Sequence, residues 1–443
     1  MLALLGSLLG FGRLEGRLES GQNLTSTFDE CRLRLGNTLG EPWMRCVVDS
    51  LLEVQATAKA RGEEYFPIEA HTFDPLAPLH GHSYGTRSDD LKNKMRDYSC
   101  DVADGGSQPL RTTAWQYEEP DVCASAATEG GAFVYKADRF LPAGNDLDLG
   151  DSHMSVHEAQ ERCEADVRCQ GFTFSAAGWS HSASRMEERQ WISFKSKSED
   201  ATRGDGWHTF KRRGEGIDCS ARALRQPRIL NFTVHVLRET PPVYLVDDFY
   251  SEAECSYMLN YTLPLMGPSV VVGGGTSTWR QSYSVNMYPD YDDETNVVTQ
   301  AARRKFAFAR TMGGYTDLQE NEGQEPVNAV YYKDFGDHYG AHCDGECSGG
   351  RYLEGHRIAT SVTYCQVAEE GGYTLFTRSG LKVVPKPRQM LFFGYIEDLA
   401  SMAMDRGHTE HSGCPLRKGR KWITTMWYRQ GVTKEKDWSR FTV

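Results

Sequence analysis

Long apolar stretches are missing from this chain of 443 residues. A membrane-spanning helix needs about 20 consecutive apolar residues, and no such stretch occurs, so the sequence predicts no membrane span. A surplus of basic residues is missing too, because the formal net charge is -12. Nucleic-acid binding depends on Lys and Arg side chains that neutralise phosphates. The net charge therefore argues against a nucleic-acid partner. The overall composition is typical of an ordinary globular protein.

The cysteines in the first 260 residues lack the close Cys-x-x-Cys pairs that mark structural metal sites. Twelve cysteines are present in the whole chain, and disulfides formed in an oxidising compartment are the simplest account of them. Cys163 and Cys169 are both expected in disulfides, each with some partner. Residues 1–21 begin with an apolar run, which is either a signal peptide without its usual basic start or an incomplete N-terminus. We expect the chain in the endoplasmic reticulum lumen or secreted.

Three potential metal ligands stand out in the C-terminal part. His342 and Asp344 are two residues apart, so both side chains reach one ion if they lie on a strand. His411 would arrive from another strand. Two imidazoles and one carboxylate leave other coordination positions open, which is the ligand set of non-haem Fe(II) oxygenases. His408 competes with His411 as the third ligand.

Lys421 follows His411 by ten residues and supplies a fixed cation. An ammonium group in a pocket beside a metal is suited to the carboxylate of an organic co-substrate. Any one of these residues is weak evidence by itself, since the chain has 13 histidines. Together they predict an iron site next to an anion-binding pocket.

The surrounding motifs carry a family resemblance. The stretches Tyr339-Gly340-Ala341-His342-Cys343-Asp344, Gly371-Gly372-Tyr373-Thr374 and His411-Ser412-Gly413-Cys414-Pro415 stand in the same order and spacing as in the prolyl 4-hydroxylases. These enzymes are 2-oxoglutarate-dependent dioxygenases, and the resemblance is strongest to the collagen-type enzymes of the secretory pathway. It implies Fe(II), 2-oxoglutarate, O2 and ascorbate, and a proline-containing protein or peptide as substrate.

The resemblance also assigns roles to individual residues. The iron ligands would be His342, Asp344 and His411, and Lys421 would pair with the distal carboxylate of 2-oxoglutarate. Tyr339 and Thr374 match further contacts to the co-substrate. Arg357 and Trp427 match positions on the substrate side.

Two positions depart from the family. Tyr373 replaces its acidic residue, and Arg429 replaces a histidine that follows the tryptophan. Both departures concern the peptide substrate rather than the iron chemistry. Hydroxylation of another residue such as lysine is therefore an alternative, and a secreted binding protein with an inactive site is another.

The fold expected for residues 241–432 is mainly β. Short runs rich in β-branched and aromatic residues, such as 327–332, 358–364 and 422–428, are separated by Gly, Pro and charged turns. This texture is typical of a double-stranded β-helix, or jelly roll, with flanking helices. Residues 433–443 are expected to form a C-terminal tail.

The part before residue 241 divides into three segments. Residues 22–128 are of unassigned type, with a helix opening at Pro42 and an irregular stretch from about Pro67 to Gln116. Residues 214–240 are expected to be a linker.

Residues 129–213 combine a helix with short strands. Ser155 and Glu158 form a capping box at the helix start, and the segment Gly171–Phe174 alternates as a strand does. With its two cysteines, the segment resembles the apple/PAN family of extracellular binding modules. The resemblance implies a small α+β domain with a protein or glycan ligand, and the alternative is a structural spacer.

Overall fold

The computed structural model describes most of the chain. The described residues are 24–62, 87–102, 106–120, 132–141, 146–150, 152–180, 182–196, 202–212, 228–270, 279–291 and 296–441. Residues 1–21, which the sequence marked as either a signal peptide or an incomplete N-terminus, lie outside them.

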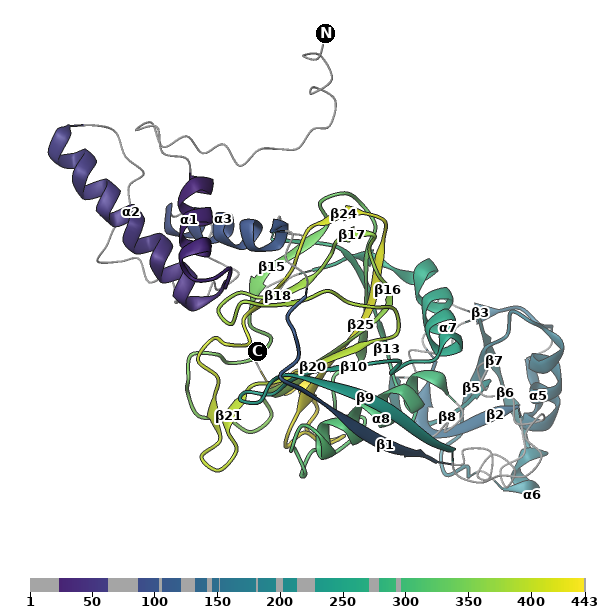
Figure 1. Ribbon diagram of the computed structural model, residues 1–443. Coiled ribbons are helices and arrows are strands. Elements are labelled where there is room, and N and C mark those ends of the chain that lie inside the picture. Colours follow the sequence, from purple (N-terminus) through teal and green to yellow (C-terminus); the bar gives the residue numbers. More distant parts are fainter. Residues whose placement is uncertain are drawn as a thin grey trace, which may run out of the picture. The chain divides into compact units, whose positions relative to one another are not determined.

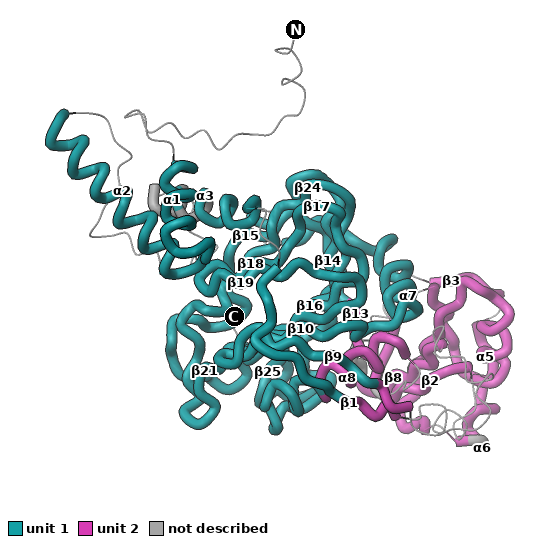
Figure 2. The backbone as a smooth tube through the Cα atoms, viewed as in Figure 1, with its two compact units in different colours: residues 1–115, 231–286, 308–443 teal, residues 116–230, 287–307 magenta. Residues whose placement is uncertain are grey.

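The chain divides into two compact units, which Figure 2 distinguishes by colour. Unit 1 contains residues 1–115, 231–286 and 308–443, and unit 2 contains residues 116–230 and 287–307. The helical N-terminal segment therefore belongs to the same unit as the C-terminal β domain. Each unit has its own hydrophobic core.

The C-terminal part of unit 1 is built from two β-sheets (Figure 1). Nine strands form the larger sheet, in the order β1-β9-β10-β20-β16-β25-β14-β13-β11, and five form the smaller, in the order β12-β15-β23-β18-β19. The strands of the larger sheet are β1 (Arg111–Glu119), β9 (Arg228–Arg238), β10 (Val243–Val246), β20 (Met390–Gly394), β16 (Arg357–Gln366), β25 (Lys421–Arg429), β14 (Val327–Tyr332), β13 (Tyr283–Met287) and β11 (Gly267–Pro268). Those of the smaller sheet are β12 (Arg280–Gln281), β15 (His338–His342), β23 (His411–Gly413), β18 (Thr374–Phe376) and β19 (Leu381–Val383).

The remaining elements of this region are short strands and helices. They are β17 (Glu370–Gly371), which pairs with β24 (Leu416–Lys418), β21 (Ile396–Asp398), which pairs with β22 (Ala403–Met404), and the helices α7 (Glu252–Thr262), η1 (Leu263–Leu265) and η2 (Trp438–Arg440). Helix α8 (Val297–Thr311) belongs to unit 2 as far as residue 307 and to unit 1 from residue 308.

The two sheets pack face to face. The ring centroids of Phe376 on β18 and Phe393 on β20 lie 5.2 Å apart. The Tyr364 hydroxyl on β16 hydrogen-bonds the Thr374 hydroxyl on β18 at 2.8 Å. The mainly β architecture predicted for the C-terminal region is confirmed.

One predicted boundary is wrong. Residues 228–240 are not linker, because β9 pairs with β10 inside the larger sheet. Val234 and Val236 on this strand are fully buried, so burial of apolar side chains holds the segment in the sheet. The predicted C-terminal tail, residues 433–443, contacts the β domain, since the Trp438 amide donates to the Gly323 carbonyl at 2.9 Å.

Three helices make up the N-terminal segment: α1 (Leu24–Arg34), α2 (Glu41–Arg61) and α3 (Arg87–Asp101). The prediction of an irregular stretch from Pro67 to Gln116 is therefore wrong for residues 87–101, which form α3, and for residues 111–116, which lie on β1. Leu91, Met95 and Tyr98 recur at helical spacing and are buried against α1 and α2. The many polar residues between them hid this stripe in the sequence.

Gly40, just before α2, is seated against the β domain. Its φ is +95°, and a Cβ there would lie 2.8 Å from both the Arg378 carbonyl oxygen and the Gly380 nitrogen. The next residue, Glu41, donates its amide hydrogen to the same Arg378 carbonyl at 2.8 Å. Only glycine combines this backbone conformation with so close an approach.

Unit 2 contains a five-stranded sheet in the order β2-β8-β5-β7-β3 and the separate pair β4-β6. Its elements are β2 (Phe133–Phe140), β3 (Asp146–Leu147), β4 (His153–Ser155), α5 (Val156–Ala165), β5 (Gly171–Ser175), α6 (Ala183–Met186), β6 (Arg189–Trp191), β7 (Ser193–Lys195) and β8 (Thr202–Arg212).

The capping box predicted at the start of α5 is confirmed. The Glu158 amide donates to the Ser155 hydroxyl at 3.1 Å, and the Ser155 amide donates to the Glu158 carboxylate at 2.8 Å. Cys163 and Cys169 are disulfide-bonded to each other, which ties α5 to the start of β5.

Disulfides also staple unit 1. The pairs are Cys31–Cys46, Cys100–Cys414, Cys255–Cys365 and Cys343–Cys347. Cys123 and Cys219 lie outside the described residues. None of the helices in the described ranges is long and apolar enough to cross a membrane.

The first prediction concerns the core of the three helices. Trp43 is 1% exposed, stacks on Tyr98 at 5.5 Å and donates its indole hydrogen to the Phe28 carbonyl at 3.1 Å. Trp43→Ala should lower the free energy of unfolding by about 3–5 kcal/mol, because it leaves a cavity. The exposed control Leu33→Ala on α1 should change it by less than about 0.5 kcal/mol. Urea unfolding followed by circular dichroism compares them, and equal effects would contradict this core.

Candidate metal centre and anion pocket

Two neighbouring strands of the smaller sheet bring the histidines together. His342 at the end of β15 is the register partner of His411 at the start of β23. The sequence predicted Asp344 on the same strand as His342. It lies beyond that strand instead, because β15 ends at His342. Cys343 is bonded to Cys347, so the chain turns directly after the strand and carries Asp344 back towards the two imidazoles.

The ligand atoms of these three residues all lie within 4.8 Å of one another. The Nε2 atom of His342 is 3.2 Å from one carboxylate oxygen of Asp344, and the Nε2 atom of His411 is 3.7 Å from the other. Metal–ligand bonds of roughly 2.1 Å at right angles place neighbouring donor atoms roughly 3 Å apart. The spacing of the cluster therefore suits one ion.

Hydrogen bonds orient both imidazoles. The Nδ1 atom of His342 lies 2.8 Å from the Gly340 carbonyl oxygen, and that of His411 lies 3.0 Å from the Thr409 carbonyl oxygen. A carbonyl only accepts, so each Nδ1 carries the proton and each Nε2 has a free lone pair. This is the tautomer that binds metals.

Protonation states agree with this arrangement. Burial lowers the pKa of His411 to about 4, so its ring is neutral at neutral pH. Burial would raise the pKa of Asp344, but nearby charged groups, the Arg357 guanidinium among them, hold it well below its usual range, so the carboxyl is ionised. A carboxylate facing two imidazole lone pairs is electrostatically unfavourable without a cation, and the donor set thus fits Fe(II).

Residues of the larger sheet hold the Asp344 carboxylate. The Thr360 hydroxyl donates to a carboxylate oxygen of Asp344 at 2.7 Å, and it also bonds the Tyr395 hydroxyl. The Arg357 guanidinium donates to the Asp344 backbone carbonyl at 3.0 Å. Thr360 and Tyr395 are buried. Such outer contacts fix the direction of a metal ligand.

Lys421 opens β25, and its side chain is buried with the ammonium group among aromatic rings. Its Nζ atom donates to the Gly372 carbonyl at 2.7 Å and lies 5.0 Å and 5.7 Å from the ring centres of Tyr332 and Tyr364. Burial lowers the pKa of Lys421 to about 7. The charge of Lys421 acts on the metal cluster, since it contributes to lowering the pKa of His411.

The residues implied as co-substrate contacts border this region. The Thr374 hydroxyl forms a hydrogen bond with the hydroxyl of Tyr364, whose ring lies beside Lys421. Tyr339 stacks on the His342 ring at 3.7 Å, and the Arg280 guanidinium lies 4.7 Å from the centre of its ring. His408 is not part of the metal-ligand cluster found among the described residues.

The residues implied for the substrate side form a network. Arg357 makes two hydrogen bonds of 2.6 Å to the Glu325 carboxylate and lies 4.1 Å from the Trp427 ring centre. Arg429, at the position that departs from the family, donates to the same carboxylate at 2.6 Å. One buried glutamate is thus shared by two arginines.

Sequence reasoning missed several of these residues, namely Glu325, Tyr332, Thr360, Tyr364 and Tyr395. Thr360 and Tyr364 are polar residues on a strand that is otherwise buried, and they share one face at a period of two. That signal could have been read from the sequence. Glu325 carried none, since it lies in a loop before β14.

The second prediction concerns the contact with Asp344. Thr360→Val should weaken metal binding about 10- to 100-fold, because Asp344 loses an orienting hydrogen bond. Thr363→Val is the matched control, since Thr363 lies on the opposite face of β16 and its buried hydroxyl has no partner among the described residues. His411→Ala gives the reference for a lost ligand. Mn(II) titration calorimetry measures all three, and equal affinities for Thr360→Val and Thr363→Val would contradict the role of Thr360.

Comparison with known proteins finds similarity in the C-terminal part of the chain, which contains the site. Residues 327–429 match the 2OG-Fe(II) oxygenase superfamily. Prolyl 4-hydroxylase 13 from Arabidopsis thaliana is 26% identical over 220 residues, which are 45% of this chain and 76% of that protein. Prolyl 4-hydroxylase subunit alpha-2 from Caenorhabditis elegans is 27% identical over 207 residues, which are 44% of this chain and 36% of that protein.

Among solved structures, the viral collagen prolyl hydroxylase vCPH from Paramecium Bursaria Chlorella virus-1, in its 2OG complex, is 24% identical. The match covers 42% of this chain and 96% of that chain, with a TM-score of 0.35. The family match and the curated relatives, together with the His-Asp-His cluster, decide the type of enzyme. The chain therefore carries a prolyl 4-hydroxylase-like 2OG-Fe(II) oxygenase domain, which uses Fe(II), 2-oxoglutarate and O2 and for which ascorbate is typical.

Proposed function

We propose that this chain hydroxylates peptidyl proline at its C4 position in proteins of the secretory pathway. The observation that carries the proposal is the convergence of His342, Asp344 and His411 on one point, close to the buried cation of Lys421. The curated relatives with this domain are named prolyl 4-hydroxylases. The metal and the co-substrate of this reaction each have a matching group of side chains in the site.

Each part of the site has a task in this reaction. Bound Fe(II) with 2-oxoglutarate and O2 supplies the oxidising power for C–H hydroxylation, while 2-oxoglutarate is converted to succinate and CO2. His342, Asp344 and His411 hold the metal and leave positions for other ligands. Lys421 binds the distal carboxylate of 2-oxoglutarate by a charge-assisted hydrogen bond. Tyr332 and Tyr364 exclude water from this pair.

Arg357 and Trp427 would border the peptide. They lie on the adjacent strands β16 and β25, and the indole N–H of Trp427 is buried without a partner among the described residues. A buried donor of this kind suits a carbonyl of a bound peptide, because it costs free energy while it is unpaired. Arg429 donates to the same Glu325 carboxylate as Arg357 and so helps to fix the partner of Arg357.

Disulfides support the secretory pathway as the location. Cys343–Cys347, Cys255–Cys365 and Cys100–Cys414 all lie next to segments of the site. Cysteine pairs of this number form and persist in an oxidising compartment such as the endoplasmic reticulum lumen. We include this location, or secretion, in the proposal.

Residues 129–213, which lie within unit 2, would serve as a binding module of the apple/PAN type. Its α+β content and the Cys163–Cys169 link between helix and strand support this assignment. A protein or glycan ligand held by unit 2 would raise the local concentration of substrate at the oxygenase domain.

The third prediction tests the reaction. Proline-rich peptides, and matched peptides in which lysine replaces each proline, are incubated with the full chain, Fe(II), ascorbate and 2-oxoglutarate. Mass spectrometry should find one added oxygen atom on proline and none with His411→Ala. Oxygen on lysine alone would replace the proposal by lysyl hydroxylation. A chain that never consumes 2-oxoglutarate would be an inactive binding protein.

The fourth prediction concerns pH. The pKa of Lys421 lies near 7 in the free protein, and only the protonated side chain attracts a carboxylate. The dissociation constant for 2-oxoglutarate should therefore rise with pH above about 7, by up to about tenfold per pH unit. Lys421→Arg should abolish this dependence, because the pKa of arginine is above about 12.

Titration calorimetry of the Mn(II)-loaded protein at about pH 6.5 and 8.5 measures this difference. Lys421→Ala should bind 2-oxoglutarate roughly ten- to a hundredfold more weakly at the lower pH, since it lacks the charge-assisted hydrogen bond. Equal wild-type affinity at both pH values would show that another cation holds the carboxylate.

A further inference from the structure

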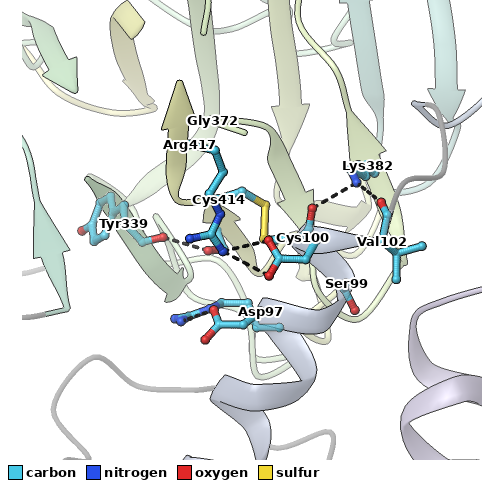
Figure 3. Close-up of a disulfide and its surroundings, with 12 residues drawn as sticks. Asp97, Ser99, Cys100, Val102, Tyr339, Gly372, Lys382, Cys414 and Arg417 are labelled. Carbon is cyan, nitrogen blue, oxygen red and sulfur yellow. Dashed lines mark hydrogen bonds and ion pairs between the residues drawn. A yellow bond between two sulfur atoms is a disulfide. The ribbon is translucent and has the colours of Figure 1, made fainter. Parts of the chain in front are cut away.

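Helix α3 is tied covalently to the segment that carries the third metal ligand. Its penultimate residue, Cys100, forms a disulfide with Cys414, and Cys414 comes three residues after His411 (Figure 3). The two cysteines are 314 residues apart in the sequence. Both are buried. A local turn of the β domain is thus fixed to a helix from the other end of the chain.

Lys382 on β19 reinforces this link. Its ammonium group donates to the carbonyl oxygens of Cys100 at 3.2 Å and Val102 at 2.6 Å, at the C-terminus of α3. A cation at this end of a helix satisfies free carbonyl groups and faces the negative end of the helix dipole. The Lys382 backbone also exchanges hydrogen bonds with Ser107, at 2.8 Å and 2.9 Å. Arg417 and Asp101 pair nearby at 2.8 Å, but both are partly exposed, so this pair contributes little.

Tyr373 completes the seat of α3. It packs against a buried cluster formed by Cys100, Leu375 and Cys414. The Lys382 ammonium lies 4.6 Å from the centre of its ring, in a cation–π contact. An acidic side chain at position 373 would lose this apolar packing against the disulfide. The departure of Tyr373 from the family pattern thus coincides with the place where α3 docks.

A short chain of hydrogen bonds leads from this seat to the anion pocket. The Cys414 amide donates to the Tyr373 carbonyl at 2.8 Å, and the Gly372 amide donates to the Pro415 carbonyl at 3.1 Å. The Gly372 carbonyl in turn accepts from the Lys421 ammonium at 2.7 Å. Any shift of Cys414 therefore moves the backbone group that holds Lys421.

We propose that the end of α3, anchored through Cys100–Cys414 and Lys382, is a positioning element for Lys421 and thereby sets the affinity of the site for 2-oxoglutarate. This inference rests on the proposed role of Lys421 as the partner of the co-substrate carboxylate. Cys100, Lys382 and Tyr373 act through Gly372 and do not touch the co-substrate. His342, Asp344 and His411 are oriented by other hydrogen bonds, so metal binding depends far less on α3.

The test compares 2-oxoglutarate binding and metal binding in the full-length protein. Titration calorimetry without O2 gives the dissociation constants for Mn(II), and for 2-oxoglutarate with the Mn(II)-loaded protein. In the double variant Cys100→Ser/Cys414→Ser, the constant for 2-oxoglutarate should rise roughly three- to thirtyfold. The constant for Mn(II) should change less than about twofold, and in turnover the KM for 2-oxoglutarate should rise more than kcat falls.

Two further variants keep the outcome decisive. Cys163→Ser/Cys169→Ser removes a disulfide of unit 2 and should leave both constants unchanged. Lys382→Met keeps the disulfide but removes the cation from the end of α3, and it should weaken 2-oxoglutarate binding in the same direction. If the Cys100/Cys414 variant does not fold, Lys382→Met decides the question by itself.

Wild-type affinity for 2-oxoglutarate in both the disulfide variant and Lys382→Met would overturn the inference. Parallel losses of Mn(II) and 2-oxoglutarate affinity would also overturn it, because they would indicate general loosening of the site. If the wild-type protein bound Mn(II) but not 2-oxoglutarate, the proposed function itself would fail, which is a separate result.

Discussion

The antiparallel pairing of β15 with β23 is the constraint on which the site depends. It sets His342 opposite His411, so that two residues 69 positions apart present their imidazoles to one point. Backbone carbonyls then fix both tautomers, and the turn closed by Cys343–Cys347 returns Asp344 to the same point. A slip of one residue in this register would turn one histidine to the other face of the sheet.

The larger sheet supplies what the metal-bearing strands cannot. Thr360 holds the Asp344 carboxylate, and Lys421 is buried among aromatic rings, where its charge is costly until an anion arrives. The same burial that lowers the pKa of Lys421 makes its pair with a carboxylate strong and specific. In the proposed reaction, co-substrate binding and the protonation of Lys421 would therefore be linked.

Disulfides anchor the segments between these groups. Three disulfides each include a cysteine that lies near a residue of the site. Cys343 lies between the ligands His342 and Asp344 and is bonded to Cys347, and Cys365 follows Tyr364 and is bonded to Cys255. Cys414 lies three residues beyond His411 and is bonded to Cys100. The last of them makes the N-terminal helices part of the catalytic unit. The close fit of Gly40 against Arg378 and Gly380 is a second point of attachment.

Much of the site could be predicted because its residues lie in short continuous motifs of the sequence. The strands around residues 327–332 and 422–428 were evident from β-branched and aromatic runs, and the ligand pair lies within three residues. The structure brings the ligand atoms of His342, Asp344 and His411 within 4.8 Å of one another, although Asp344 follows the strand rather than lying on it.

Helix α3 was missed because its apolar stripe is sparse and its partners are distant. Leu91 and Met95 are buried in a cluster that α1 and α2 complete. The Cys100–Cys414 pairing could not be read from spacing, since sequence alone does not give disulfide connectivity. Glu325 and its two arginines were likewise joined only by the fold.

The most direct test of the account is a crystal structure of the protein with Mn(II) and 2-oxoglutarate, with the metal located by anomalous scattering. The account predicts one strong peak bound by Nε2 of His342, Nε2 of His411 and the carboxylate of Asp344. It also predicts the distal carboxylate of 2-oxoglutarate within hydrogen-bonding distance of the Lys421 ammonium. A metal held by other residues, or a distal carboxylate paired with Arg357 or Arg280, would contradict it.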